Sequence, residues 1–287
     1  MTAIGNPTVA TLPKPRVRDF GTFVSSAHPL RPYLTADGQN RWPAGVTWNA
    51  WGCPDDVNIE AIDCDLHTRD TDPDGFGNLQ TVAAFTLWDA IQCSTLAALP
   101  AELEDRLRYS LDDTISFAVA QAFMAGAGGA DGFNQFYGIN SNDFTVEKSI
   151  DALGQAEQYL ADTLHGALGF IHTQPRVLVH LLREEAVELV DNQFISPLGH
   201  IVVVDAGYGD GLLDPDIPAV DNGGWMVTSG PVYFVLNEFH PWATPNTFES
   251  LNLPHNDMKL LADRQAIIAF DECGSSFITI SNVGTAA

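Results

Sequence analysis

Apolar residues recur at helical spacing in the middle of the chain, starting near Ser149. Every third or fourth residue is apolar, which places these side chains on one stripe of one helical face. Ser149 is a suitable N-cap, and Gly166 and Gly169 interrupt the pattern. The spacing therefore predicts a helix that begins at Ser149. Its apolar stripe consists of Ile150, Leu153, Ala156, Leu160, Leu164 and Leu168.

A strand, a helix and a second strand are predicted next. Gly169–Thr173 is short and apolar, as a buried strand is, and Pro175 begins a helix expected to run to about Val190. His200–Asp205 is β-branched on both faces, so we expect it to be covered on both. The glycine-rich segment Ala206–Gly211 is the turn that leaves this strand. These segments predict a compact α/β unit.

The longest predicted helix precedes this unit. It begins at Pro100, where acidic residues in the first turn suit the positive end of the helix dipole, and ends near Gly126. Thr81–Cys93, before it, has the pattern of a strand. The apolar stripe of the helix consists of Leu103, Leu107, Leu111, Ile115, Ala118 and Ala122.

Strand patterns follow the α/β unit. Trp225–Leu236 predicts a strand that is broken at Gly230 and Pro231. Arg264–Ser281 predicts a β-hairpin that turns at Glu272–Gly274. We therefore expect the chain to close on a β ribbon.

The first 80 residues differ from this core in composition and charge. Six prolines in residues 1–50 exclude long helices and central strands, so this segment is expected to be an extended arm. Five basic residues against two acidic ones give residues 1–41 a charge of +3. Residues 53–77 carry eight acidic residues and one arginine, a charge of −7, and their pattern predicts a long protruding hairpin. The arm is thus basic and the hairpin acidic.

The whole chain of 287 residues is strongly acidic, with a net charge of −24. A protein that grips nucleic acid needs basic surface to displace counterions from phosphates, so specific DNA or RNA binding is disfavoured. The charge is also consistent with a purely solubilising role. The N-terminus lacks the pattern of a signal peptide, and no segment is apolar enough to span a membrane. The four cysteines form no C-x-x-C pair and are expected to be reduced thiols.

Candidate chemistry in the sequence is sparse. Asp70–Gly75 resembles the opening of a calcium-binding loop, but Thr81 occupies the position of the bidentate glutamate, so we expect a solvated acidic turn. The histidines His165, His172 and His180 are expected on separate elements, as ordinary core or interface residues. No serine-nucleophile, zinc-protease or phosphate-loop motif is present. The sequence predicts no catalytic residue, metal or cofactor.

One position leaves an enzymatic alternative open. Asp205 and Asp210 follow the strand His200–Asp205, where open α/β sheets often bind ligands. No accompanying catalytic group is evident in the sequence. An α/β enzyme with a ligand near Asp205 to Asp210 is therefore the alternative to a structural role.

The order of parts and several short phrases resemble a known family of shell proteins. Arm, protruding hairpin, long helix, α/β domain and closing β ribbon follow one another as in the major capsid proteins of tailed bacteriophages with the Hong Kong 97-like fold. Encapsulin shells share this order. The local sequence is similar to the small capsid proteins of actinobacterial phages in the segments Leu164–Arg176, Ser196–Tyr208, Trp225–Val232 and Asp263–Ile267.

The resemblance implies an α+β Hong Kong 97-like capsid fold in five parts. These are an N-terminal arm (1–50), a protruding E-loop hairpin (51–80), a peripheral domain with a spine helix at 100–125 (81–148), an α/β axial domain (149–225), and return strands with the closing ribbon of the peripheral domain (226–287). It further implies a non-enzymatic protein that assembles into hexamers and pentamers of an icosahedral shell around double-stranded DNA.

The implied partners are other copies of the chain, a portal, and separate scaffolding or decoration proteins. The implied location is the virion capsid, assembled in the cytoplasm of the bacterial host. Because the arm begins within the first ten residues, we expect no scaffolding segment to be removed by proteolysis. An encapsulin or another phage structural protein is the alternative within the same class.

The opposite charges of arm and hairpin predict a contact between subunits. Both segments are too extended to satisfy their charges and bury their aromatic residues locally, so a neighbouring subunit is the expected partner. The predicted contact residues are Arg16, Arg18 and Arg31 in the arm and Asp55, Asp56, Asp63, Asp65, Asp70, Asp72 and Asp74 in the hairpin.

Overall fold

The computed structural model describes residues 28–29, 46–49, 79–82, 85–94, 100–125, 142–208, 223–236, 240–241, 251–252, 257–270 and 274–283. Within them lie a six-stranded, a seven-stranded and a two-stranded sheet with α-helices. The helices are α2 (Pro100–Ala125), α3 (Ser149–Leu164) and α4 (Pro175–Arg183), with a 3₁₀ turn η2 (Ala206–Tyr208). The strands are β1 (His28–Pro29), β2 (Val46–Asn49), β3 (Leu79–Val82), β4 (Phe85–Ser94), β5 (Asn142–Val146), β6 (Phe170–Thr173), β7 (Glu188–Val190), β8 (Gln193–Ile195), β9 (Ile201–Val204), β10 (Gly224–Ser229), β11 (Val232–Leu236), β12 (His240–Pro241), β13 (Leu251–Asn252), β14 (Asp257–Phe270) and β15 (Ser276–Ile280).

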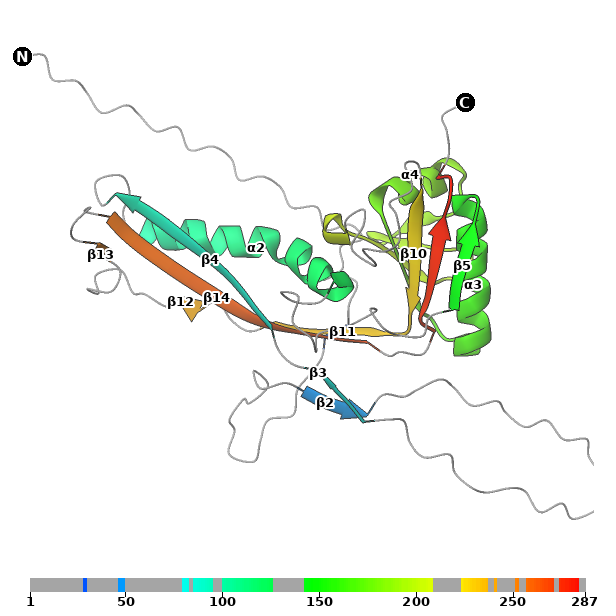
Figure 1. Cartoon of the computed structure of the whole chain (residues 1–287), viewed down its shortest axis with the longest axis horizontal. Helices are drawn as coiled ribbons and strands as arrows, with labels where there is room; N and C mark the ends of the chain where they lie inside the picture. The colour runs from blue at the N-terminus through cyan, green and yellow to red at the C-terminus, as the bar shows by residue number, and fades with distance from the viewer. Residues whose placement is uncertain are drawn as a thin grey trace, which may run out of the picture.

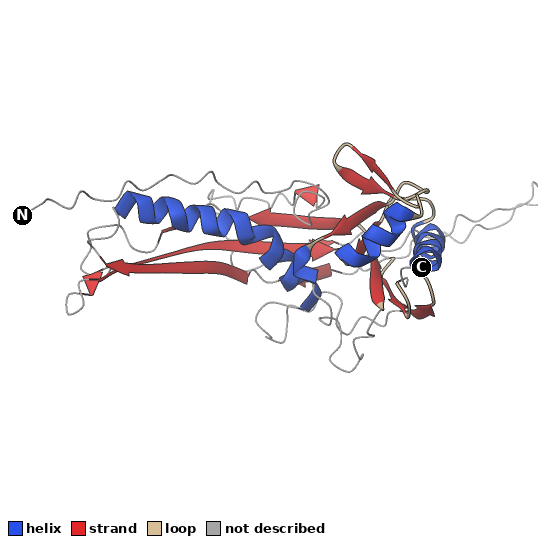
Figure 2. Cartoon of the chain, turned by 90° about the horizontal axis from the view of Figure 1, so that it is seen from above, coloured by secondary structure: helices blue, strands red, loops and turns tan. Residues whose placement is uncertain are grey.

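The described part of the molecule is elongated. The long strands β4 and β14 run beside helix α2, and the seven-stranded sheet stands at one end of them (Figure 1). The view from above shows the same side-by-side arrangement of helix and strands (Figure 2). None of the described helices is long and apolar enough to cross a membrane.

Helix α2 joins the two large sheets, because its apolar stripe continues from one to the other. The stripe of the first half, with Leu103, Leu107 and Leu111, packs on Leu260 and Ala262 of β14. The second half packs in a core that contains residues of both large sheets, through Val119, Ala120, Ala122, Phe123 and Met124. The 26-residue helix predicted from Pro100 is thus confirmed, and its length follows from having two cores to fill.

The seven-stranded sheet has the strand order β5-β15-β10-β6-β9-β8-β7. Successive side chains of β6 alternate between its faces, as in any strand. Ile171 faces a core made with α3 and α4, whereas Phe170 faces the core that contains the end of α2. Strand β9 is likewise covered on both faces, as its β-branched sequence predicted, with Val202 in the first core and Val203 in the second.

The chain crosses from one large sheet to the other between β10 and β11. Strand β10 pairs with β6 and β15, whereas β11 pairs with β14. Gly230 and Pro231 lie between the two strands, so the break predicted at these residues is confirmed. Proline has no backbone N–H, and it therefore suits a position where ladder pairing stops.

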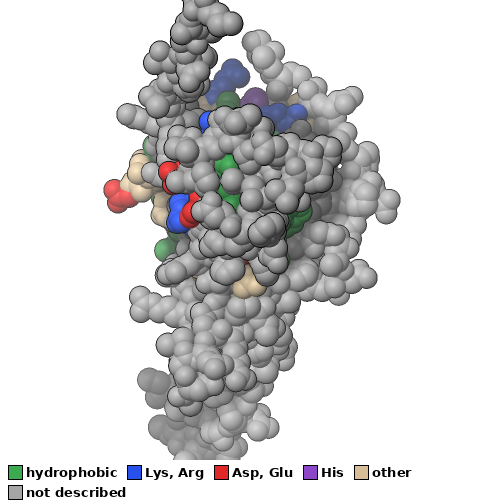
Figure 3. Space-filling view, turned by 90° about the vertical axis from the view of Figure 1, so that its left-hand side faces the viewer, with side chains coloured by type: hydrophobic (Ala, Val, Ile, Leu, Met, Phe, Trp, Pro, Cys, Tyr) green, Lys and Arg blue, Asp and Glu red, His purple; other side chains and the backbone are tan. Residues whose placement is uncertain are grey.

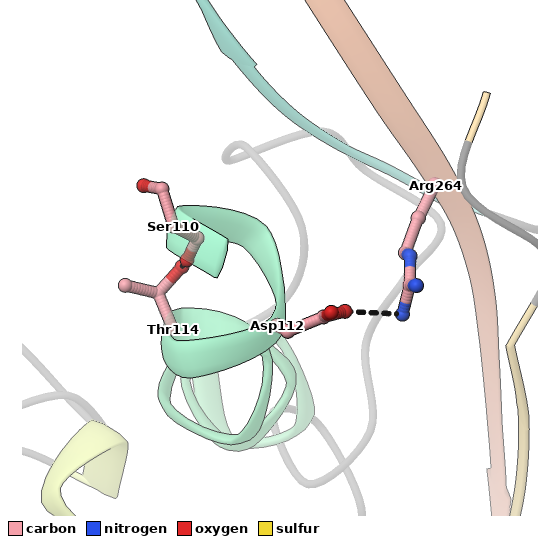
Figure 4. A network of polar contacts seen from close by, with 4 residues as sticks. All are labelled: Ser110, Asp112, Thr114 and Arg264. Carbon is pink, nitrogen blue, oxygen red and sulfur yellow. Dashed lines mark hydrogen bonds and ion pairs between the residues drawn. The ribbon is translucent and has the colours of Figure 1, made fainter. Parts of the chain in front are cut away.

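Polar contacts fix α2 to the long strands as well. Arg264 of β14 forms an ion pair with Asp112 of α2, at 2.9 Å between Nη1 and Oδ1 (Figure 4). Two residues earlier on α2, Ser110 Oγ donates a hydrogen bond to Asp89 Oδ2 of β4. Thr114 Oγ1 donates to the carbonyl of Ser110. The contacts of Asp112 and Ser110 orient the first half of α2. The second half is held by packing and by a hydrogen bond from Ser116 Oγ to Asp205.

Strands β2 and β3 form the antiparallel two-stranded sheet, from Val46 opposite Val82 to Asn49 opposite Leu79. These strands bracket residues 50–78 and hold the two ends of that segment together. A protruding hairpin starts and ends in such a pair of antiparallel strands, and we call the β2–β3 pair its stem. The hairpin itself and the proposed arm, apart from the short strands β1 and β2, lie outside the described residues.

Two strand and helix assignments from the sequence are wrong. Helix α4 ends at Arg183, because Glu185 adopts a left-handed backbone with φ 55°, and the residues up to Val190 enter a β-hairpin instead. Asp191 and Asn192 form its turn with φ 48° and 65°, the positive values that two-residue hairpin loops need.

The predicted hairpin Arg264–Ser281 is also wrong. Strand β14 pairs with β4 and β11, whereas β15 pairs with β10 and β5 in the other large sheet. The chain therefore passes from one sheet into the other between Phe270 and Ser276. The seven-stranded sheet takes both β5 and β15 from outside residues 149–225.

The start of α3 differs in detail from its prediction. Lys148 is the N-cap and makes no side-chain cap hydrogen bond, while Ser149 lies inside the helix and is buried. Ile150 and Leu168 were predicted on the apolar stripe but are 42% and 59% exposed. The observed buried stripe begins one position earlier and consists of Ser149, Ala152, Leu153, Ala156, Leu160 and Leu164.

Candidate functional site

The residues predicted to join subunits lie outside the described part of the chain. Arg16, Arg18 and Arg31 precede or follow β1, and the acidic residues from Asp55 to Asp74 all fall between β2 and β3. Only the stem that brackets the acidic segment is described. The predicted contact between arm and hairpin therefore stays a prediction.

The alternative ligand position after β9 is occupied by structural hydrogen bonds at Asp205. This carboxylate is buried, and its Oδ2 accepts a 2.7 Å hydrogen bond from Ser116 Oγ of α2. Its Oδ1 accepts one from the backbone N–H of Gly207 at 2.9 Å. Asp205 thus fastens η2 to α2, while Asp210 lies outside the described residues. This geometry gives no support to a ligand site at Asp205.

Helix α2 and η2 approach each other closely at Gly207. A Cβ atom built on Gly207 would lie 2.2 Å from the carbonyl oxygen of Phe117 and 3.0 Å from the Cβ of Ala120. Only glycine allows the backbones to come this near. Asp205, Gly207 and Ser116 therefore form one local fastening between η2 and α2.

A buried histidine lies at the centre of the junction between the two sheets. His172 of β6 is fully buried, and its Nδ1 lies 2.8 Å from Tyr208 Oη. Its Nε2 lies 3.0 Å from Ser229 Oγ, at the end of β10. The ring also packs against Phe123 of α2, with centroids 5.0 Å apart. One imidazole thus links β6, η2, β10 and α2.

Burial dominates the electrostatics of this junction. It lowers the pKa of His172 from 6.5 to about 3, because a charged ring loses its hydration there. Burial and the nearby Asp205 carboxylate both raise the pKa of Tyr208 well above its usual range. At neutral pH both side chains are therefore uncharged and hold each other by hydrogen bonds.

The other histidines do not join His172. His165 lies at the exposed C-cap of α3 with φ 49°, and His180 lies in the last turn of α4. Across the described ranges, no group of three or more metal-ligating side chains comes together. The sequence placed these histidines on separate elements, and the structure confirms that placement.

A second buried histidine, His200, stabilises the loop before β9. His200 Nδ1 accepts a hydrogen bond from the backbone of Gly169 at 3.1 Å. Glu157 of α3 accepts another from the backbone N–H of Leu198 at 2.8 Å. Burial lowers the pKa of His200, and the negative charge of Glu157 partly opposes this shift. These contacts order residues 196–200 at one end of the sheet.

Exposed apolar side chains gather at the same end of the molecule. Nine large ones are exposed among the described residues, and six of these fall between Leu168 and Leu198. A pocket of about 350 Å³ adjoins them, with Val187, Val190 and Ile195 in its wall and Glu185 and Glu188 beside it. The six residues are Leu168, Val179, Leu182, Leu189, Val190 and Leu198. Where such side chains form a continuous patch, they are typical of a surface that contacts another protein.

The surface at the opposite end has a different character. Seen end-on from the far end of the long strands, the described side chains that show are acidic, basic and hydrophobic ones close together (Figure 3). On α2, Arg108 and Glu104 form an exposed ion pair at 3.5 Å. Such an exposed pair contributes little to stability.

Comparison with solved structures identifies the architecture. One match is the capsid of an empty GTA particle, with a TM-score of 0.55, 12% identity, and 99% of this chain and 98% of that chain covered. The chain has the Hong Kong 97-like capsid fold. The capsid of Ralstonia phage GP4 shares this fold at a TM-score of 0.53 and 12% identity, covering 100% of this chain and 99% of that one.

The Hong Kong 97-like fold of this chain is also that of a cellular shell protein. An encapsulin complex from Synechococcus elongatus PCC 7942 matches with a TM-score of 0.54 and 10% identity, covering 98% of this chain and 96% of that one. Comparisons of the sequence with family models and with curated proteins found no match. The α+β fold predicted from the sequence is thus confirmed, while identities this low establish the fold alone.

The sequence did not indicate the junction at His172 or the β7–β8 hairpin. The available signal for the junction was a histidine inside a fully buried strand, which needs hydrogen-bond partners wherever they lie in the chain. The signal for the hairpin was Asp191-Asn192, two residue types that tolerate positive φ. Each signal comes from one or two neighbouring residues, whereas the partners of His172 lie far from it in the sequence.

Proposed function

We propose that this chain is the major capsid protein of a tailed bacteriophage, a non-enzymatic subunit of an icosahedral shell. The observation that carries this proposal is the match over almost the whole of both chains to capsid proteins of the same fold. Two features of the chain support it. The β2–β3 stem provides the base for a protruding hairpin, and exposed apolar side chains gather at one end of the molecule.

In this proposal the subunits form hexamers and pentamers that enclose double-stranded DNA, with a portal and separate scaffolding or decoration proteins as further partners. Assembly takes place in the cytoplasm of the host, and the product is the capsid of the virion. The net charge of −24 supports containment of the DNA without specific contacts. The parts of the subunit follow the predicted ranges 1–50, 51–80, 81–148, 149–225 and 226–287, with β5 and β15 added to the sheet of the α/β part.

An encapsulin compartment is the second candidate, because the encapsulin match is as good as the phage matches. Electron microscopy of particles formed by the full chain tests the shared part of the proposal, since only a shell protein gives closed particles. A small, discrete oligomer would refute both shell functions. Nuclease-protected genomic DNA in particles from the native source supports the phage capsid, whereas a protein cargo without DNA supports the encapsulin.

We further propose that the basic arm of one subunit contacts the acidic hairpin of its neighbour. Each exposed pair contributes about 0–1 kcal/mol, so the aromatic residues of the arm supply most of the affinity and the charges set the register. Replacement of Arg16 and Arg18 by serine should lower the temperature or salt concentration at which shells dissociate. Arg106→Ser, on the exposed side of α2, is the control. Equal dissociation of the arm variant and the parent would exclude this contact.

A further inference from the structure

The crossing between the two large sheets is held by side chains from distant parts of the sequence. Strand β10 ends at Ser229, and β11 begins two residues later, after Gly230 and Pro231. His172 lies on the neighbouring strand β6, opposite Val227 of β10, and its ring reaches Ser229. The crossing is thus attached to the sheet that the chain is leaving.

The hydrogen bonds around His172 have one consistent direction. Ser229 Oγ donates to the carbonyl of Gly230 at 3.0 Å, so it accepts from Nε2–H of His172. The ring therefore carries its proton on Nε2 and accepts at Nδ1 from the hydroxyl of Tyr208. This latch chain, Tyr208–His172–Ser229–Gly230, is complete only when the imidazole is neutral.

On the described elements that surround the ring, the other ionisable side chains are two tyrosines and the carboxylate of Asp205. Strands β6, β9 and β10 contribute no other ionisable side chain, nor do residues 114–125 of α2 or 265–270 of β14. Tyr233 of β11 and Tyr208 of η2 are the ionisable tyrosines on the elements of this junction. The carboxylate of Asp205 faces Tyr208 and already accepts hydrogen bonds from Ser116 and Gly207. A proton on Nδ1 would place two donors, N–H and O–H, against each other.

The junction is separate from the two other cores of the molecule. One core joins α3 and α4 to the opposite face of the seven-stranded sheet. Another joins the first half of α2 to β14. Neither includes His172, Tyr208 or Ser229, so the contacts around the crossing can loosen while both of these cores persist.

We propose that the latch chain holds the seven-stranded sheet at a fixed angle to the long strands. Protonation of His172 breaks this chain of hydrogen bonds and thereby loosens the β10–β11 crossing. The released state keeps both outer cores folded and exposes the imidazole to water. The segments that change are η2, the end of β6 and residues 227–232.

The size of the effect follows from the titration of the ring. A histidine with a depressed pKa stabilises the closed state fully above its ordinary pKa, and this contribution is lost as the pH falls toward the depressed value. For a shift from 6.5 to about 3, the equilibrium constant for opening rises on the order of 100-fold between pH 7 and pH 4.5.

Hydrogen exchange of the full chain, read by mass spectrometry at pH 7 and 4.5 and corrected for the intrinsic pH dependence, tests the latch. We expect the 100-fold rise in opening in residues 205–208 and 227–232, with α3 and residues 103–111 still protected. His172→Gln keeps an acceptor and a donor but cannot titrate, so it should remove the rise. His200→Gln is the matched control, because His200 also has a lowered pKa but lies outside the junction, and it should leave the rise unchanged.

Tyr208→Phe provides a second variant if His172→Gln fails to fold. It removes the hydroxyl that donates to Nδ1, so a proton on Nδ1 no longer faces a second donor and the pKa of the ring in the closed state is lowered less. The rise in opening between pH 7 and pH 4.5 should therefore be smaller than in the parent. An unchanged acid response in either variant of the latch chain would overturn the proposal. Simultaneous loss of protection in α3, residues 103–111 and the crossing would also overturn it, because the response would then be global unfolding.

Discussion

Gly207→Ala should destabilise the protein strongly, because it forces η2 away from α2. The added Cβ would lie 2.2 Å from the carbonyl oxygen of Phe117 and 3.0 Å from the backbone nitrogen of Gln121. Real Cβ atoms do not approach other heavy atoms closer than about 3 Å, so the backbones must part by nearly 1 Å. The 2.7 Å bond from Ser116 to Asp205 spans the same gap and would lengthen with it.

The expected loss is about 3 kcal/mol or more in the free energy of unfolding, from overpacking at about 1–3 kcal/mol and a weakened charge-assisted hydrogen bond at about 1.5–3 kcal/mol. Urea unfolding of the unassembled chain, followed by circular dichroism and tryptophan fluorescence, measures it. Trp225 is a suitable reporter, because its ring packs on Tyr208 of η2 at 5.7 Å.

Gly154→Ala is the matched control for this prediction. Gly154 lies on the exposed side of α3, and no heavy atom lies within 4 Å of a Cβ built on it. Alanine should therefore stabilise the helix by about 0.5–1 kcal/mol. A loss below about 1 kcal/mol in Gly207→Ala, well under the expected overpacking cost, would show that η2 is free to move and would refute the reasoning.

The remaining predictions concern the long unit and the assembled particle. Leu107→Ala should cost about 2–5 kcal/mol in the same unfolding assay, because Leu107 is 1% exposed between α2 and β14. Leu189→Ala, at a 51% exposed position, should change stability by less than about 0.5 kcal/mol, and equal effects of the two variants would contradict the assigned core. Asp112→Asn should cost only about 0–1 kcal/mol, because Asp112 is 48% exposed, and a much larger loss would mean that its ion pair with Arg264 dominates the attachment of α2. Boiled particles should run as monomers on a denaturing gel, because no lysine lies between Lys14 and Lys148 to cross-link the hairpin; covalent ladders would show that another segment supplies the nucleophile.

Local patterns predicted the elements that depend on local causes. The stripe from Leu103 along α2, the two-sided burial of β9 and the break at Pro231 all follow from periodicity or from proline chemistry over a few residues. The end of α4 was missed because it depends on the left-handed backbone of Glu185, a residue type with no strong preference for that conformation.

Pairing between distant segments was not predictable from the same patterns. Strands β14 and β15 have the alternation and the intervening turn of a hairpin, yet each finds its partners in a different sheet. The junction has the same origin, because His172, Tyr208 and Ser229 are brought together only by the parallel pairing of β6 with β9 and the antiparallel pairing of β6 with β10. A single sequence contains the residue types but not this register.

The attachment of α2 to two cores makes the helix a lever. Its buried, uncharged half is fixed at the junction, while the half that begins at Pro100 extends along β14. A helix of 26 residues is about 39 Å long, so a tilt of about 5° at the fixed end moves the far end by about 3 Å. A rotation of α2 that is too small to break a hydrogen bond at His172 therefore moves the Pro100 end of the helix by about 3 Å, at the other end of the molecule.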